Sequence, residues 1–261
     1  MQNHVLTAQN ITVRFGGLVA LSDISIAFPA GRGIDAIIGP NGAGKTTLFN
    51  VLTGVVRPTG GKLIAQGSDL TGMRPDQIFR RGVSRTFQGV RLFEHLTVEQ
   101  NVTLAARSTA SRAERATGKL APGWRNAADG RARAQRAMDL VELGAALRHR
   151  MPGRLSLWES RMVEIARAIG SEPQILLLDE PAAGFSAAEK ARLGALLIEI
   201  SAALDCRLVV VEHDMSFVMS LAERVWVLNF GRLIADGAPA EVQADPQVRE
   251  AYLGGKREEA A

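Results

Sequence analysis

The stretch "GPNGAGKTT", residues 39–47, is the strongest signal of the fold in the sequence. It follows the short apolar run "GIDAII" (33–38) and leads into the helix-like "TLFNVLTG" (47–54). Strand, glycine-rich loop and helix in this order, with the spacing G-x-x-x-x-G-K-[ST], form the context of a phosphate-binding loop. The alternative, a glycine-rich turn with a lysine at this place by chance, would have to account for all three parts together.

The loop predicts a nucleotide site with a magnesium ion. Its glycines let successive amide groups curl round phosphates, and the start of the following helix adds a favourable dipole. We expect Lys45 to reach and neutralise the terminal phosphates, and the Thr46 hydroxyl to bind Mg²⁺. The predicted nucleotide-binding residues of the loop are Gly39, Pro40, Asn41, Gly42, Ala43, Gly44, Lys45, Thr46 and Thr47.

Two further apolar runs end in side chains suited to phosphate chemistry. "ILLLDE" (175–180) ends in Asp179 and Glu180, and "LVVVEH" (208–213) ends in His213. The carboxyl ends of parallel strands are where ligands collect. We therefore expect Asp179 to hold Mg²⁺ through water, Glu180 to orient or deprotonate the attacking water, and His213 to sense the γ-phosphate. The competing interpretations are helix N-terminal acids and a surface histidine with its own partners.

The pattern of strand and helix signals changes in the middle of the chain. Two β-like runs separated by "GGLVALSD" (16–23) lead to Phe28, and strand signals continue to Phe87. A Thr-x-x-Gln capping box at Thr97 then opens a helical stretch with a break at "LAPGWRNAADG" (120–130), before strands and helices alternate again. That alternation predicts parallel strands joined by helical crossovers. We divide the chain into an N-terminal part of the ATP-binding core (1–94), a helical insert (95–170), a C-terminal part of the core (171–253) and a tail (254–261).

Composition limits the classes of protein. The 261 residues are 46% hydrophobic, yet no apolar run approaches a membrane span, and the N-terminus lacks the pattern of a secretory signal. The single Cys206 excludes an internal disulfide and fits a reducing cytoplasm. Ten Lys or Arg against four Asp or Glu in residues 107–150 form a basic segment. A solvated helical face explains it best, with nucleic acid or anionic lipid as alternative contacts.

Together the phosphate loop, the acid pair and the histidine resemble the ABC-type ATPase family. The resemblance implies an α/β fold with a mostly parallel core sheet, an antiparallel β subdomain and an inserted α-helical subdomain. It also implies that Gln88, in "RTFQGVRLF", is a ligand of Mg²⁺ and water, and that Phe15, in "VRFGG", stacks on adenine. In the family, two such subunits form a head-to-tail sandwich in which each signature helix closes the partner's nucleotide.

The signature position departs from the family pattern. "LSLWE" (155–159) stands where the family has Leu-Ser-Gly-Gly-Gln, so Ser156 matches as the contact to the partner's nucleotide while Trp158 adds bulk and Glu159 adds charge. Ser156 and Glu159 also form a capping box for an amphipathic helix, which needs no nucleotide. Ser186 replaces a family aspartate that crosses to the other subunit. These departures favour a heterodimer with one good and one poor site.

Several stretches, among them "VEHDMSFVM" and "AYLGG", narrow the resemblance to the larger-type ATPase subunit of branched-chain amino-acid importers. That type implies two transmembrane permease subunits, a second ATPase subunit, an external substrate-binding protein and a cytoplasmic place on the inner face of the membrane. The alternatives are a lipopolysaccharide-export ATPase, a soluble ABC protein acting on nucleic acid or in cofactor assembly, and a weakly hydrolysing regulatory subunit. The absence of a tandem ATPase and of long heptads argues against nucleic acid.

Overall fold

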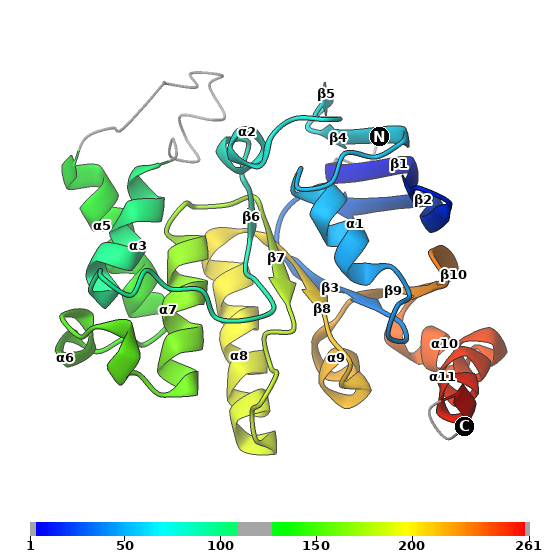
Figure 1. The fold of residues 1–261 in the computed structure, drawn as a ribbon. Coiled ribbons are helices and arrows are strands. Elements are labelled where there is room, and N and C mark those ends of the chain that lie inside the picture. The colour runs from blue at the N-terminus through cyan, green and yellow to red at the C-terminus, as the bar shows by residue number, and fades with distance from the viewer. Residues whose placement is uncertain (1–3, 109–126, 259–261) are drawn as a thin grey trace.

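A mixed six-stranded sheet forms the centre of the protein (Figure 1). The computed structural model describes residues 4–108 and 127–258. The strand order is β10–β9–β3–β8–β7–β6, parallel throughout except for β10. The strands are β3 (Gly33–Ile38), β6 (Val83–Arg85), β7 (Ile175–Asp179), β8 (Arg207–Val211), β9 (Arg224–Asn229) and β10 (Arg232–Gly237). The predicted mostly parallel core sheet is confirmed.

A smaller antiparallel sheet lies beside the central one, at the upper right of Figure 1. Its order is β2–β1–β4–β5, with β1 (His4–Phe15), β2 (Leu18–Pro29), β4 (Gly60–Ala65) and β5 (Ser68–Asp69). The prediction that residues 16–23 separate the first two strands was wrong, because β2 already begins at Leu18, paired with Phe15. Gly16 has φ 58, so the turn takes only two residues.

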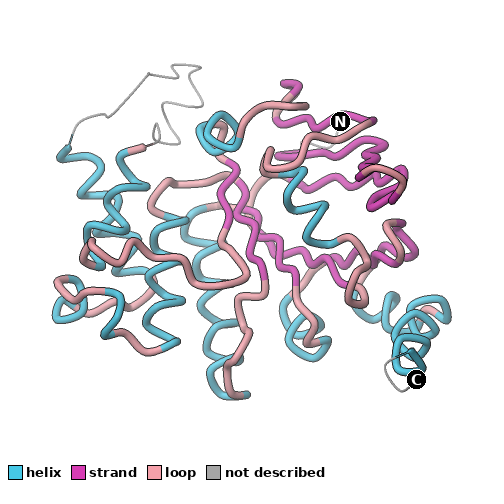
Figure 2. The backbone as a smooth tube through the Cα atoms, in the orientation of Figure 1, coloured by secondary structure: helices cyan, strands magenta, loops and turns pink. Residues whose placement is uncertain are grey.

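Helices cover both faces of the central sheet and form a separate group between β6 and β7 (Figure 2). The separate group contains α3 (Val98–Arg107), α5 (Ala127–Leu140), α6 (Ala145–Arg148), the 3₁₀ turn Pro152–Arg154 and α7 (Leu157–Ile169). The other helices are α1 (Lys45–Leu52), α2 (Pro75–Arg80), α8 (Ala187–Leu204), α9 (Met215–Leu221), α10 (Pro239–Ala244) and α11 (Pro246–Glu258). No strand interrupts the described part of the helical insert, as expected.

Continuous apolar strands place the core on both sides of the sheet. All five residues of β7 and of β8 are buried. Leu176 and Leu178 pack with the helical insert and α8, whereas Ile175 and Leu177 pack with α1 and the small sheet. Because successive side chains point to opposite faces, a strand covered on both faces is apolar along most of its length, and the charged residues of β7 and β8 stand only at their ends, as Asp179 and Arg207.

Three helices begin with capping boxes, two of them at the predicted residues Thr97 and Ser156. The Oγ atoms of Thr97, Ser156 and Ser186 accept hydrogen bonds from the backbone amides three residues later, at 3.3, 3.2 and 3.4 Å. The glutamine or glutamate at the third position bonds back to the capping residue's own amide. Ser186 therefore has a local role at the start of α8.

Two expectations about irregular segments are corrected. The tail expected from Gly254 is helical over its first part, because α11 continues to Glu258. Of the break expected over residues 120–130, residues 120–126 lie outside the described residues, and residues 127–130 already belong to α5. The division of the chain into four parts stays a prediction.

Arginines of the basic segment pair with acids of the same chain. Arg133 lies 3.3 Å from Asp129, and Arg148 lies 2.5 Å from Asp139. Arg136 reaches Glu172, outside the segment, at 3.0 Å. These pairs favour a structural and solvated role for the described part of this segment. Among the residues that the structure describes, no helix is both long enough and apolar enough to cross a bilayer.

A buried carboxyl group in β3 predicts a stability that depends on pH. Burial raises the pKa of Asp35 to about 7, against the opposing effect of Arg207, whose Nε lies 3.6 Å from Oδ2. The unfolded chain releases this proton near its ordinary pKa of 3.8, so the folded state binds more protons than the unfolded state between these values. The free energy of unfolding therefore falls as the pH rises towards and through 7.

We expect the fall in the free energy of unfolding between pH 5 and pH 8 to be smaller in Asp35→Asn by about 2–3 kcal/mol, because an amide has no proton to lose. Urea unfolding between pH 5 and pH 8 measures it. Arg207 keeps Glu223 as a partner at 2.8 Å in the variant. Equal slopes of stability against pH in the wild type and the variant would contradict the assignment.

Candidate active site

The phosphate loop joins β3 to α1 with little room for side chains. Gly39 has φ 151, and a Cβ there would lie 2.1 Å from the carbonyl oxygen of Leu228. Gly44 has φ 102, and a Cβ there would come within 2.9 Å of the Ala20 carbonyl oxygen. Both positions need glycine for the conformation and for the space. The loop is therefore held close against β9 and β2, with α1 beginning at its end.

Lys45 is the buried cation of the site. Its Nζ donates hydrogen bonds to the carbonyl oxygens of Gly39 and Pro40, at 2.7 and 2.8 Å. Burial lowers the pKa of Lys45, while the nearby charges of Glu180 and Asp179 oppose that change. The ammonium group is thus positioned by its own loop and lies in the field of the acid pair.

Asp179 ends β7 as a buried carboxylate. Burial raises its pKa, and the Arg85 guanidinium, 3.4 Å away, opposes this effect. Arg85 also donates to Asn50 Oδ1 and Thr53 Oγ1, at 2.9 and 3.1 Å, so it joins β6 to α1 and β7. The sequence analysis missed Arg85. Its position directly before "TFQ" would have been the only signal.

Glu180 meets the two other polar residues predicted for catalysis. Its Oε2 accepts a hydrogen bond from Gln88 Nε2 at 3.3 Å, and its Oε1 is in close hydrogen-bonding contact with His213 Nε2. The backbone of Glu180 is left-handed, with φ 48, and its amide donates to Val211 O at 2.9 Å. A non-glycine residue held in this conformation is typical of functional sites.

Glu212 holds the backbone next to these residues in place. The sequence analysis did not identify it. Its Oε1 accepts from the Ala182 amide at 2.8 Å, and its Oε2 accepts from the His213 amide at 3.2 Å. The side chain is buried, which raises its pKa. Glu212 therefore fixes the turn after Glu180 and the start of the His213 loop relative to each other. Its place at the end of an apolar strand was the available signal.

One pocket of about 780 Å³ brings most of the predicted residues together. Lys45, Glu180 and His213 line it, and so does the aromatic side chain of Phe15. The other predicted residues that line it are Asn41, Gly42, Ala43, Gly44, Thr46, Thr47 and Gln88. Gly39, Pro40 and Asp179 do not line the pocket. The carbonyl oxygens of Gly39 and Pro40 accept hydrogen bonds from Lys45, which does line it. Ser156 is not part of it.

The Trp158 side chain, at the start of α7, packs against residues of its own chain. Its ring lies 5.2 Å from the Phe185 ring, and the Arg192 guanidinium lies 4.7 Å above it. Leu157 is the more exposed side chain, at 49%, and lies against Gly184. The apolar face predicted for this helix is confirmed, since Met162 and Ile165 are buried.

We expect Trp158→Ala to lower the free energy of unfolding by about 2 kcal/mol, because a partly buried aromatic ring loses its contacts with Phe185 and Arg192. Leu157→Ala is the control and should change stability by less than ~0.5 kcal/mol. Chemical denaturation of both variants measures the difference. Equal stability of the two variants would show that the Trp158 contacts contribute little.

Comparison with known families fits this geometry. The family model described as "ABC transporter" matches residues 21–183, which include the phosphate loop, Gln88 and the acid pair. The chain belongs to the ABC transporter family. This ABC ATPase also matches, over residues 232–258, a model described as "Branched-chain amino acid ATP-binding cassette transporter".

Relatives and solved structures resemble the ABC ATPase over nearly its whole length. LivG of Salmonella typhimurium, a high-affinity branched-chain amino acid transport ATP-binding protein, is 39% identical over 97% of this chain and 99% of its own. BraF of Pseudomonas aeruginosa, with the same description, is 37% identical over the same shares. The ADP conformation of the MJ1267 ATP-binding cassette matches with a TM-score of 0.82 and 28% identity, over 96% of this chain and 99% of that one.

Proposed function

We propose that this ABC ATPase drives an importer of branched-chain amino acids or related small amino-acid and amide solutes. The observation that carries the proposal is the match of its C-terminal segment, residues 232–258, to the branched-chain amino acid model. Relatives described as branched-chain amino acid transport proteins match 97% of the chain, which supports the same conclusion. The chain would stay peripheral on the inner face of the cell membrane, bound to permease subunits, with an external substrate-binding protein delivering the solute.

The site residues support hydrolysis by in-line attack of water on the γ-phosphate. Lys45 and the amides of the loop hold and neutralise the phosphates. Glu180 orients the water and accepts its proton, while Gln88 and His213 hold the Glu180 carboxylate from two sides. Asp179 is kept in place by Arg85.

Mg²⁺ fits the donors on this edge of the sheet. The Thr46 hydroxyl, the Gln88 amide oxygen and the Asp179 carboxylate are all oxygen donors, which a small hard cation prefers. Thr46 and Gln88 both line the nucleotide pocket. When bound, the ion would neutralise charge on the phosphate oxygens.

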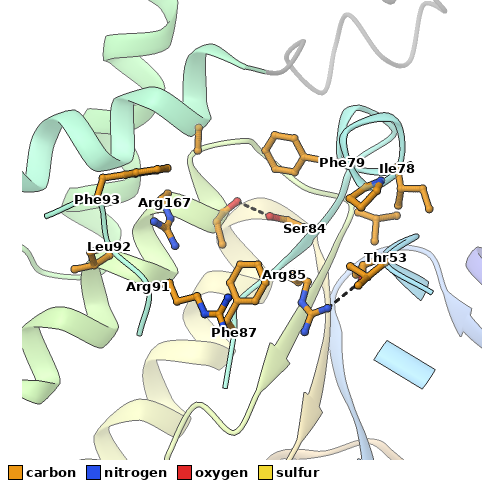
Figure 3. Close-up of a pocket in the computed structure, with 15 residues that line it drawn as sticks. Thr53, Ile78, Phe79, Ser84, Arg85, Phe87, Arg91, Leu92, Phe93 and Arg167 are labelled. Atoms are coloured by element: carbon orange, nitrogen blue, oxygen red, sulfur yellow. Dashed lines mark hydrogen bonds between the residues drawn. The ribbon is translucent and has the colours of Figure 1, made fainter. Parts of the chain in front are cut away.

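A second pocket, of about 420 Å³, is the place where we expect a permease loop to dock (Figure 3). Phe79 lies on one side of it and Leu92 and Phe93 on the other, with Phe87 and Arg91 between them. Phe93 is 50% exposed, and the Arg167 guanidinium lies 5.7 Å from the centre of its ring. Phe87 directly precedes Gln88, so the docked loop would act one residue away from the Glu180 contact.

We further propose a heterodimer with a second ABC ATPase subunit. Ser156 would contact the partner's nucleotide, but exposed Leu157 and the Glu159 carboxylate stand where the family has small or neutral residues. A homodimer would carry this poor signature at both sites. Leu157→Gly tests the point, because removing the bulk of the exposed side chain should raise closure at the partner's site.

Transport tests the function directly. The chain would be purified with its permeases and partner ATPase, reconstituted in vesicles, and supplied with labelled leucine, urea or a short amide and with ATP. We expect ATP-dependent uptake of leucine together with stimulated ATP turnover. Uptake of none of these solutes, or stimulation only by a lipid substrate, would contradict the importer proposal.

A further inference from the structure

The turn between β9 and β10 carries an aromatic residue in an unfavourable place. Phe230 and Gly231 join the strands, and both have positive φ, 44 and 72. Two-residue turns of this kind favour Asn, Asp or Gly at the first position, and a bulky side chain there is uncommon. The Phe230 side chain is also 82% exposed, so burial within the chain does not offset this cost.

The turn is fixed against the nucleotide site. The Gly231 amide donates to the carbonyl oxygen of Ala43, in the phosphate loop, at 3.0 Å. The Gly231 carbonyl oxygen accepts from the Ser22 amide at 2.8 Å, and a Cβ on Gly231 would lie 2.5 Å from Ala20 O. These contacts of Gly231 with the phosphate loop and β2 therefore fix the backbone position of the neighbouring Phe230.

Phe230 lines the nucleotide pocket together with other apolar side chains. Phe15, Leu18 and Val19 line the same pocket, and all three are at least 36% exposed. Lys45, Glu180 and His213 also line this pocket. The pocket therefore offers both kinds of contact that a nucleotide needs, because the flat base is apolar on its faces and the triphosphate is charged.

We propose that Phe230 is a second aromatic contact for the nucleobase, which forms a base-binding wall together with Phe15. The proposal rests on the proposed function, in that residues 39–47 must bind the triphosphate. It explains why an exposed aromatic residue occupies a turn position that suits asparagine. Stacking of a base on an aromatic ring is sequence-tolerant, so Phe230 would strengthen binding of purine nucleotides in general.

The variant Phe230→Asn separates the base contact from the fold. Asparagine suits the turn, so thermal stability should be unchanged or higher. Calorimetry on the isolated chain with Mg²⁺ should show about tenfold weaker binding of ATP and of ADP, and unchanged binding of inorganic tripolyphosphate, which has no base. Phe230→Trp should keep the affinity for ATP. Ile198→Gln, at an exposed apolar position on α8, is the matched control and should match the wild type.

The outcomes distinguish this inference from the proposed function. Wild-type binding of ATP with equal affinity in Phe230→Asn would overturn the base contact and leave the phosphate site standing. Parallel loss of ATP and tripolyphosphate binding in Phe230→Asn would also overturn it, because the turn would then act through Ala43. If the wild type binds neither ATP nor tripolyphosphate, the proposed function itself fails. Unchanged ATP affinity with weaker pairing to a second ATPase subunit would assign Phe230 to the subunit interface instead.

Discussion

Replacing Glu180 with glutamine is expected to lower ATP turnover of the assembled ATPase pair by at least ~100-fold, because general-base catalysis contributes about that much. The amide keeps the size and the hydrogen-bonding reach of the side chain but cannot accept the proton of the attacking water. Glu180 is well placed for the role, since Gln88 and His213 both contact its carboxylate. Phosphate release under saturating ATP measures turnover.

ATP binding should survive this substitution, because Lys45 and the loop amides hold the phosphates independently of Glu180. Glu199→Gln, at an exposed position of α8, is the control and should leave turnover unchanged. Unchanged turnover in Glu180→Gln would show that another group orients the water. A loss of ATP affinity in step with turnover would show that Glu180 acts in binding.

The local parts of the site could be predicted from the sequence because their signals are local. The spacing of Gly39, Gly44 and Lys45 after an apolar strand determines the loop and the helix that follows it. Asp179 and Glu180 stand at the end of a strand that is buried on both faces, so their place at the ligand edge follows from the apolar run. The capping boxes likewise locate the starts of three helices.

Contacts between distant elements could not be predicted in the same way. Arg85 and Asp179 are 94 positions apart and meet only because β6 and β7 are neighbours in the sheet. Helical periodicity places Trp158 on the apolar face of α7, but it does not say that Phe185 and Arg192 lie opposite. Glu212 looked like an ordinary strand-end acid until the turn after Glu180 was seen to bond to it.

Replacing Glu164 with alanine is expected to lower the free energy of unfolding by about 3–5 kcal/mol, because it leaves a buried charge without its partner. Arg161 and Glu164 are 3% and 1% exposed and lie 2.7 Å apart on α7. Burial raises the pKa of Glu164, and Arg161 opposes that change. Glu164 also accepts from the Phe87 amide at 3.2 Å, and Arg161 donates to Phe87 O at 3.4 Å. Chemical denaturation measures the stability.

The double variant Arg161→Met, Glu164→Leu separates the charge effect from the contact with Phe87. It should recover most of the lost stability, because apolar side chains of similar volume replace a buried ion pair at little cost. It should not recover ATP turnover, because the backbone of Phe87 loses both of its partners and Gln88 is then less firmly held near Glu180. If the double variant regains turnover along with stability, α7 does not position Gln88 through Phe87. If Glu164→Ala is as stable as the wild type, Arg161 must find solvent or another acid when its partner is removed.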